Sequence, residues 1–587
     1  MRFSWLLEKT SILRSVFASQ LEDGDGSDSS VKQVAIIGAG AAGSSAAYHL
    51  RRYAEEAGIP LNITVFEKTD RIGGRTLTVD VYDDVLNPVE LGASIFIEAN
   101  HILFNATKEF NLTTVEPGSD EEGDLAIWDG DYFRYRQDSE SWGWWKLAKL
   151  FWKYGTAPYY THKLTEQTVA TFLQLYNAPH FPFRSLSQTA FDLGLTKVTG
   201  MTGEQFLAEN KIDSKYARDI VQASTRVNYA SNLAWIHGLG TMVSMAPEGA
   251  MQVPGGNWQI FSKMIEASNA RVYLNSSVSS IELKENAGPD ATPKYVIKTA
   301  SPGATADEAE LHSVAFDDVI IATPYQFSNI TNANDLIEHP IDVIPYAKLH
   351  VTLFATPFQY SPKFFKLEPG SKAPISVLTT LAEGEEGRDG AGHAGFYSAT
   401  LVKMVTNPKT QNKEYVYKIF SPEKVTPEFL SSLLGVAVPD TFTGPAPVGD
   451  EEAPAADEVV EPISWYHPAV FHPYPIKHPR VTFQDPVLRD GLYYTSGIDS
   501  FISTMETNAL MGMNVARLIV DGYLSSSSEF EFESESESMS ADADVDTVSD
   551  GAPALQVEHE QYVLEEQHDE VVSGSSDQPD HETPEEL

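Results

Sequence analysis

Six residues near the N-terminus have the types and spacing of a phosphate-binding turn. The stretch Gly38-Ala39-Gly40-Ala41-Ala42-Gly43 directly follows the apolar run Val34–Ile37. The first glycine permits a tight turn, the second lets the backbone approach a pyrophosphate, and the third lets a helix pack closely on a strand. The free N–H groups at the start of that helix attract phosphate. Together these features predict a dinucleotide site rather than a chance glycine turn.

An acidic residue follows at the distance expected for a ribose contact. A second predicted strand, Asn62–Phe66, ends at Glu67, 24 residues after Gly43, and Lys68 comes next. A carboxylate at this place accepts hydrogen bonds from a ribose and repels a 2′-phosphate. The order strand, glycine turn, helix, strand and glutamate is far more specific than the glycines alone.

Further glycine-rich segments favour FAD as the dinucleotide. Arg71–Arg75 contains a Gly-Gly pair between arginines, which suits the longer FAD better than NAD, although a plain turn is the alternative. Near the other end, Gly491–Gly497 reads as a strand before a helix over Thr504–Val520, and a helix N-terminus stabilises negative charge on a reduced flavin. The cofactor-binding candidates are Gly38, Gly40, Gly43, Glu67, Lys68, Gly73, Gly74, Arg75, Gly92, Ala93, Ser94, Val278, Gly497, Asp499 and Met505.

Elements far apart in the sequence must come together to position these residues. Residues 317–324 read as another buried strand, and 271–283 as two short strands with Val278 placed to meet an adenine. We therefore predict an α/β fold, with a Rossmann-like FAD-binding domain assembled from discontinuous segments plus an α+β substrate-binding domain. The FAD-binding domain is expected to comprise residues 31–100, 250–325 and 485–522, and the substrate domain residues 101–249 and 326–484.

Composition excludes several classes of function. The 587 residues include 41 Lys+Arg, 83 Asp+Glu and no cysteine, giving a formal charge of −42. Without cysteine there are no disulfides, thiolate nucleophiles or flavin tethered through sulfur. So acidic a chain is a poor nucleic-acid binder, and the scattered histidines lack metal-ligand spacing, so we predict no metal. Residues 525–587 hold 20 acidic residues and no Lys or Arg, which predicts a disordered acidic tail.

The N-terminal 30 residues are expected to be a poorly ordered leader. A signal sequence is one interpretation, but Glu8-Lys9 interrupts the apolar stretch that such a signal needs. Five N-x-S/T sequons occur, at Asn62, Asn105, Asn111, Asn275 and Asn329. We expect Asn62 to be buried in its strand, and Asn105 and Asn111 to lie on a helix and at its end, so the latter two are the better glycosylation candidates.

The motifs taken in order resemble those of the prenylcysteine oxidases, also called prenylcysteine lyases, within the Gly-Gly-doublet FAD oxidases. The resemblance rests on Arg226–Tyr229, His237–Gly240, Pro254–Asn257, Trp465–Pro475 and Gly497–Glu506, and covers roughly residues 31–522. It implies a thioether oxidase that converts farnesyl- or geranylgeranyl-cysteine to free cysteine, an isoprenoid aldehyde and hydrogen peroxide, with O2 as acceptor, in prenylated-protein catabolism. It also implies a lysosomal or vacuolar setting, and the unusual leader leaves localisation open.

In this interpretation the flavin carries the chemistry, and no catalytic acid or base is demanded. Arg226, Asn228, Tyr229 and His237 are the candidates for polar lining of the site. Arg226 would face a substrate carboxylate or form a structural salt bridge, and His237 would be a base or, more often in such turns, a structural histidine.

An aromatic stretch supplies candidates for a greasy substrate tunnel. It contains Trp142, Trp144, Trp145, Phe151, Trp152, Tyr154, Tyr159 and Tyr160. The alternatives are core residues or a surface for a membrane or partner, since Lys146, Lys149 and Lys153 punctuate the stretch and could lean toward anionic lipid. A related amine oxidase or isoprenoid desaturase, and a flavin-binding carrier without activity, are the competing functions. Oligomeric state is not predicted.

Overall fold

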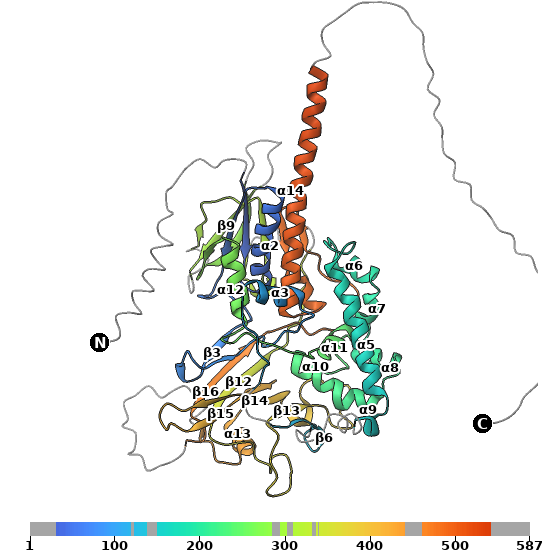
Figure 1. Cartoon of the computed structure of the whole chain (residues 1–587), viewed down its shortest axis with the longest axis vertical. Coiled ribbons are helices and arrows are strands. Elements are labelled where there is room, and N and C mark those ends of the chain that lie inside the picture. Colours follow the sequence, from blue (N-terminus) through green and yellow to red (C-terminus); the bar gives the residue numbers. More distant parts are fainter. Residues whose placement is uncertain are drawn as a thin grey trace, which may run out of the picture. The chain divides into compact units, whose positions relative to one another are not determined.

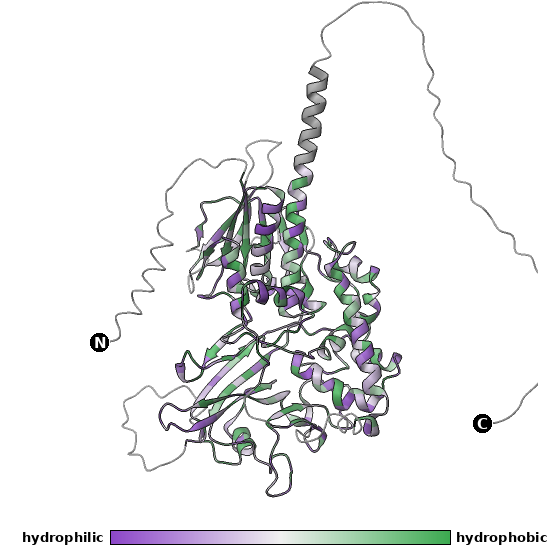
Figure 2. Cartoon of the chain, in the orientation of Figure 1, coloured by the Kyte–Doolittle hydropathy of each residue, from purple (hydrophilic) through white to green (hydrophobic). Residues whose placement is uncertain are grey.

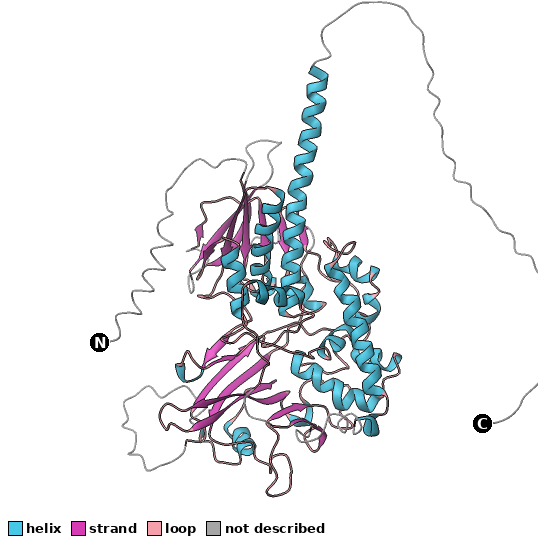
Figure 3. Ribbon diagram, viewed as in Figure 1, coloured by secondary structure: helices cyan, strands magenta, loops and turns pink. Residues whose placement is uncertain are grey.

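A computed structural model describes residues 31–118, 123–137, 150–284, 294–301, 309–331, 336–337, 340–440 and 461–541, with side chains described as far as 526. The predicted leader (1–30), the aromatic residues Trp142, Trp144 and Trp145, and residues 542–587 lie outside this description. Strands gather in two separate groups, each flanked by helices (Figure 3). Apolar residues concentrate along the strands and along the helix faces that cover them (Figure 2).

The first group is a six-stranded sheet in the order β17-β18-β11-β1-β2-β7. Its centre is β1 (Lys32–Ile37), which pairs in parallel with β2 (Leu61–Phe66) and with β11 (Asp318–Ile321). Parallel pairing adds β7 (Arg271–Tyr273) and β18 (Leu492–Tyr494), and β17 (Val487–Arg489) closes the edge in antiparallel sense. Central strands covered on both faces must be apolar throughout, and Val34, Ala35 and Ile36 have no exposed surface.

Helices cover this sheet at unusually close range. α2 (Ala41–Ala57) follows the glycine turn, and α12 (Trp258–Ala267) and α14 (Met505–Ala541) lie beside it (Figure 1). A Cβ atom at Gly43 would lie 1.9 Å from the Gly38 carbonyl oxygen, so only glycine lets α2 approach β1. Gly512 plays the same part between α14 and α2, because a Cβ there would lie 2.2 Å from the carbonyl oxygen of Ala42.

The second group is a seven-stranded mixed sheet in the order β16-β12-β15-β14-β13-β5-β6. Its strands are β5 (Leu125–Trp128), β6 (Phe133–Arg136), β12 (Leu349–Thr356), β13 (Ser376–Thr379), β14 (Ser398–Thr406), β15 (Lys413–Ser421) and β16 (Trp465–Phe471). Two small sheets complete the described strands: β3 (Thr78–Asp80) with β4 (Pro88–Glu90), and β8 (Ser277–Lys284), β9 (Lys294–Ala300) and β10 (Glu310–Leu311). The predicted fold class is confirmed: the Rossmann-like sheet draws strands from separated segments, beside a mixed α+β region.

The remaining described helices are α3 (His101–Glu109), α5 (Ala157–Phe172), α6 (Leu186–Asp192), α7 (Leu195–Thr199), α8 (Gly203–Glu209), α9 (Ser214–Tyr216), α10 (Gln222–Tyr229), α11 (Gly238–Ser244) and α13 (Pro427–Leu434). Most of them, α5 to α11, follow one another between β6 and β7 in the sequence. They lie beside the second sheet (Figure 1). None of the described helices is both long enough and apolar enough to cross a membrane.

One boundary differs and one local prediction is wrong. α14 continues to Ala541, so the helix includes the first residues of the predicted acidic tail, which had been expected to begin at residue 525. Asn62 is exposed rather than buried, since it is the one outward-facing residue of β2, a strand otherwise buried on both faces. Asn105 and Asn111 lie as expected, on α3 and just after it.

Candidate functional site

A large cavity begins at the carboxyl end of β1, where the glycine turn leads into α2. Five glycines line it, and four of them, Gly38, Gly40, Gly73 and Gly74, form what we call the glycine wall. Gly38, Gly73 and Gly74 have φ of 107°, 121° and 58°, a region that side chains rarely adopt. A Cβ at Gly74 would lie 3.0 Å from the Cα of Gly40, so the doublet contacts the turn itself.

The cavity has the size and lining expected of a dinucleotide site. Its volume is about 730 Å³, within the ~300–1,000 Å³ usual for ligand sites. Besides the glycine wall, the predicted residues that line it are Glu67, Lys68, Arg75, Gly92, Ala93, Ser94, Val278, Met505, Asn228 and Tyr229. The structure therefore brings predicted residues from six separated segments together around one cavity, and the chain fits a bound dinucleotide there.

Glu67 lies where β2 ends and is held in place by hydrogen bonds. Its carboxylate accepts from the backbone N–H of Ala39 at 2.8 Å and from the N–H and hydroxyl of Thr69 at 2.9 and 2.8 Å. The side chain is only 6% exposed, yet it borders the cavity. An oriented carboxylate at the end of the second strand is the group that a ribose requires.

Three predicted cofactor residues lie behind the cavity rather than on its surface. Gly43 packs α2 against β1, and a Cβ at Gly497 would lie 2.4 Å from the Gln484 carbonyl oxygen. Asp499 is 1% exposed and binds Arg75 at 3.0 Å, and it also accepts from Asn508 at 2.9 Å. Arg75 and Asn508 both line the cavity, so Asp499 orients the groups that would meet the cofactor.

The opposite side of the cavity is formed by side chains from the second sheet and its neighbours. Tyr229, Phe420, Phe471 and Tyr474 line it, and we call them the aromatic wall. The rings of Tyr229 and Tyr474 meet edge to face, with centroids 5.4 Å apart. Tyr229 is one of the candidates predicted from the sequence, and Phe471 and Tyr474 lie within Trp465–Pro475, a stretch predicted only through its family resemblance. Phe420 carries no signal in the sequence.

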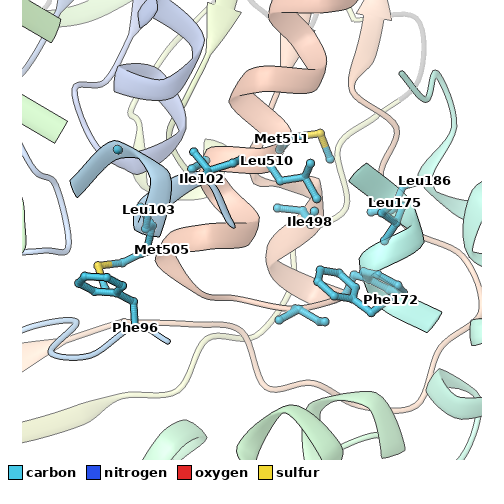
Figure 4. Packing of buried hydrophobic residues seen from close by; sticks show 14 of the residues in the cluster. Phe96, Ile102, Leu103, Phe172, Leu175, Leu186, Ile498, Met505, Leu510 and Met511 are labelled. Carbon is cyan, nitrogen blue, oxygen red and sulfur yellow. The ribbon is translucent and has the colours of Figure 1, made fainter. Parts of the chain in front are cut away.

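An apolar chamber of about 150 Å³ adjoins the cavity. The two spaces share the lining residues Ile95, Asn228, Tyr229, Thr504 and Met505. The rest of the chamber is mainly aliphatic and aromatic, with Phe96, Leu103, Val169, Phe172, Leu173, Val243, Ala246, Pro247 and Ile502. Figure 4 shows the core around it, where Phe96, Leu103 and Met505 lie together and Phe172 packs beyond Ile498.

Glu506 is the charged residue among those that line the chamber. Its carboxylate accepts from the N–H groups of Ile102 and Leu103 at 2.9 and 3.0 Å, and from the Tyr176 hydroxyl at 2.8 Å. Burial raises the pKa of Glu506 to about 7, because the charged form loses hydration that these donors only partly replace. The carboxyl therefore ties α14 to the start of α3.

Arg226 does not face the cavity, so its predicted contact with a substrate carboxylate is wrong. The guanidinium has no exposed surface and donates to Thr379 at 2.8 Å, Asn232 at 2.9 Å and the Ala391 carbonyl at 2.8 Å. Burial lowers its pKa to about 10. No carboxylate of the described residues pairs with it either, so it is a buried cation held by neutral acceptors that fastens α10 to β13 and the 390–396 loop.

His237 is the N-cap of α11. Its Nδ1 accepts from the N–H of Gly240 at 3.0 Å, and Nε2 lies 3.2 Å from the Ser500 carbonyl oxygen. Burial lowers its pKa to about 3, so the ring is neutral. The structure therefore supports the interpretation of His237 as a structural histidine rather than a base.

The aromatic stretch does not line the tunnel, as far as it is described. Phe151, Trp152, Tyr159 and Tyr160 are 60%, 90%, 64% and 53% exposed, whereas Tyr154 is buried between α5 and its neighbours. None of the five borders either space. The tunnel prediction is wrong for these residues because composition alone does not say which face of a helix is buried, and four of the rings lie exposed on the surface.

Sequence reasoning missed a buried lysine beside the cavity. Lys418 of β15 donates to the Ser94 hydroxyl at 3.0 Å and to the Glu90 carbonyl at 2.9 Å. Burial lowers the pKa of Lys418 to about 8 and raises that of Glu90 to about 7. A lysine within an alternating strand carries no sequence signal, because its partners come from residues more than 300 positions away.

A parallel sheet with a glycine turn, a carboxylate at the second strand and a dinucleotide-sized cavity define a Rossmann-like dinucleotide-binding protein with a second region built on a mixed sheet. The model of the NAD(P)-binding Rossmann-like domain matches residues 36–110, and the model of prenylcysteine lyase matches residues 137–531. This chain belongs to the prenylcysteine lyase family.

Known proteins match over most of the chain. Farnesylcysteine lyase of Arabidopsis thaliana is 27% identical over 85% of this chain and 90% of its own length. Human prenylcysteine oxidase 1 is 25% identical over 83% of this chain and 88% of its own. Among solved structures, cyclohexylamine oxidase from Brevibacterium oxydans superposes with a TM-score of 0.48 at 15% identity, covering 84% of this chain and 99% of that one.

Proposed function

We propose that this protein is an FAD-dependent thioether oxidase that cleaves farnesylcysteine and geranylgeranylcysteine. One thioether, one water and one O2 give free cysteine, an isoprenoid aldehyde and hydrogen peroxide, so atoms and electrons balance. Bound FAD would supply the two-electron oxidation. The names of two relatives, farnesylcysteine lyase and prenylcysteine oxidase 1, support this substrate class.

The observation that carries the proposal is the apolar chamber beside the dinucleotide-sized cavity. An isoprenoid chain is a hydrocarbon, and burying it in the chamber would remove its apolar surface from water. The shared residues Asn228 and Tyr229 place polar atoms at the junction, where the sulfur and the amino-acid end of the substrate would lie. The glycine wall and Glu67 would hold the cofactor on the other side.

The test is anaerobic mixing of the purified protein with farnesylcysteine in a stopped-flow spectrometer. We expect the flavin band to bleach, and peroxide and free cysteine to appear when air is admitted. S-octylcysteine, which lacks the allylic double bond, should leave the band oxidised. A flavin that stays oxidised with farnesylcysteine would contradict the proposed function, and a protein that binds no FAD would contradict the cofactor assignment.

A matched pair of variants tests the chamber itself. Ala246 lines it, so Ala246→Trp should fill the space and lower the bleaching rate at least about tenfold while FAD stays bound. Ala208 is exposed on α8, so Ala208→Trp introduces the same ring where it should change nothing. Equal rates for both variants would show that the prenyl chain binds elsewhere.

We also propose that the exposed aromatic surface, Phe151, Trp152, Tyr159 and Tyr160, contacts a lipid bilayer. Tryptophan and tyrosine prefer the membrane interface. Residues 150–166 carry two lysines and one glutamate in a chain of charge −42, so anionic headgroups meet less repulsion here than elsewhere. Native protein should co-float with vesicles of phosphatidylcholine and phosphatidylserine, and failure to do so would contradict the contact.

For localisation we propose a lysosomal or vacuolar compartment, reached through the secretory pathway. All five sequon asparagines, Asn62, Asn105, Asn111, Asn275 and Asn329, are exposed, which glycosylation requires. Protein from its native cells should lose mass on treatment with peptide-N-glycosidase F. An unchanged mass would contradict this route.

A further inference from the structure

Lys477 is a buried lysine whose amine has no polar partner. The residue is 1% exposed, and among the described residues no hydrogen-bond acceptor reaches its Nζ. A buried ammonium without acceptors is costly, so such an arrangement calls for a reason. The contrast with Lys418 is direct, because that amine has two oxygen acceptors within 3.0 Å.

The contacts of this amine are the two tyrosines of the aromatic wall. Nζ lies 3.7 Å from the centroid of the Tyr229 ring and 5.1 Å from that of Tyr474. A cation over a ring face is attracted by the negative face of the ring. Both tyrosines border the large cavity, and Tyr229 also borders the chamber. Lys477 itself borders neither, so it backs the two rings.

The backbone around Lys477 fixes the amine in this position. The N–H of His237 donates to the Lys477 carbonyl at 2.7 Å. A Cβ at Gly240 would lie 3.2 Å from the Lys477 Cδ, so the start of α11 gives the lysine stem its path. The side chain is therefore directed at the rings by two separate contacts.

The charged groups around Lys477 do not neutralise it by direct pairing. Asp499 attracts it and Arg75 repels it, but Asp499 is already bonded to Arg75 and Asn508. His237 is neutral, and the remaining groups that face the amine are the phenols Tyr229 and Tyr474. Burial lowers the pKa of Lys477, so the ammonium loses its proton at a lower pH than a free lysine.

We infer that Lys477 is a specificity-determining residue that makes the site beside Tyr229 and Tyr474 favour neutral substrates over ammonium ions. The inference rests on the proposed function, because it places the substrate beside these rings. A pair of tyrosines with free faces attracts ammonium groups. Here the faces already hold the Lys477 amine, and while that amine is protonated a second cation in the adjoining space is repelled across a low-dielectric interior. A prenylcysteine carries no charge at sulfur, and its ammonium is balanced by its own carboxylate, so it has no net positive charge to be repelled.

Two ligands of the same shape test the inference by calorimetry. One is farnesyltrimethylammonium, whose charge does not depend on pH, and the other is its isostere with a tert-butyl carbon in place of nitrogen. We expect the native holoenzyme to bind the neutral ligand at least about tenfold more tightly. Lys477→Met should narrow this ratio to about threefold or less, and Lys477→Arg should keep it. Lys163→Met removes the same charge from an exposed position on α5 and should leave the ratio unchanged.

The pH dependence of the native ratio gives a second test that needs no stable Lys477→Met protein. Burial lowers the pKa of Lys477, so raising the pH should deprotonate the amine and make the ratio fall, whereas in Lys477→Arg the ratio should stay constant. A ratio unchanged in Lys477→Met, or a native protein that binds the cation as tightly as the isostere, would overturn the inference. Loss of stability with an unchanged ratio would show a purely structural lysine. Absence of flavin bleaching by farnesylcysteine with the tenfold ratio intact would overturn the oxidase assignment alone.

Discussion

The two walls of the large cavity are built in different ways. The glycine wall presents backbone: Gly38, Gly40, Gly73 and Gly74 come from short motifs, and Gly38, Gly73 and Gly74 combine a positive φ with a neighbour within 3.0 Å of where a Cβ would lie. The aromatic wall presents side chains, and its members arrive from α10, β15, β16 and the loop after β16. The glycine wall therefore comes from short sequence motifs, whereas the aromatic wall forms only when the fold brings distant residues together.

This difference sets how each wall fails when it is altered. A backbone wall has no spare volume, so one added carbon is felt at once. A side-chain wall depends on a second layer of residues that hold it from behind, here Lys477 against the two tyrosine rings and Arg226, which fastens α10, the helix of Tyr229. Substitutions at the glycine turn and glycine wall should therefore impair folding and cofactor binding together. Substitutions behind the aromatic wall should change either stability or substrate specificity without the other.

The largest effect is expected at the glycine turn. Gly43→Val places its Cβ 1.9 Å from the Gly38 carbonyl oxygen, so α2 must leave β1. We expect a loss of more than about 4 kcal/mol of unfolding free energy and no FAD-binding protein. Gly58→Asn is the control, because Gly58 ends α2 with φ of 68° and no neighbour within 4 Å, and asparagine tolerates that conformation. Absorbance at the flavin band and urea unfolding measure both, and a yellow, stable Gly43→Val would contradict the close packing of α2 on β1 that supports the glycine wall.

The second layer of the aromatic wall is tested at Arg226. Arg226→Met leaves the Thr379 hydroxyl and the carbonyls of Gly390 and Ala391 without their buried donor, which should cost about 3 kcal/mol. FAD binding at the glycine wall should persist in whatever protein folds. Denaturant unfolding and flavin absorbance check this. If the variant were stable and its Michaelis constant rose only for substrates that bear a carboxylate, Arg226 would have to contact the substrate, and its structural role would be contradicted.

The same contrast explains what could be predicted from the sequence. The glycine turn, Glu67, the Gly-Gly doublet and Met505 were placed correctly around one cavity, because motif spacing along a parallel strand fixes geometry locally. Arg226 was misplaced because a helix residue has several faces and only the packing of β13 and the 390–396 loop decides which is buried. Lys418, Lys477 and Gly512 were missed, since each matters through a partner that tertiary structure alone supplies.

A pH experiment sharpens the description of the chamber. Burial raises the pKa of Glu506 to about 7, above its ordinary 4.5. Its contribution to stability is therefore full at low pH and is lost as the pH rises through 7, because the unfolded chain releases the proton first. Between pH 4.5 and 8 the native protein should lose up to about 3 kcal/mol relative to Glu506→Gln. Unfolding curves at each pH measure this, with exposed Glu166→Gln as control. Parallel curves for native protein and Glu506→Gln would contradict the raised pKa.

The smallest effect on stability is expected outside both walls, at Trp152. This ring is 90% exposed and borders neither the cavity nor the chamber, so Trp152→Ser should change the unfolding free energy by less than about 0.5 kcal/mol. Bleaching by farnesylcysteine dissolved in buffer should be unchanged, whereas co-flotation with vesicles should weaken several-fold. The matched control is Trp128→Phe, a buried tryptophan of β5, which should lower stability and leave flotation intact. If Trp152→Ser slowed bleaching in buffer, the exposed aromatic surface would be part of the substrate path. That result would contradict the conclusion that the two walls form the site and that the aromatic surface lies outside it.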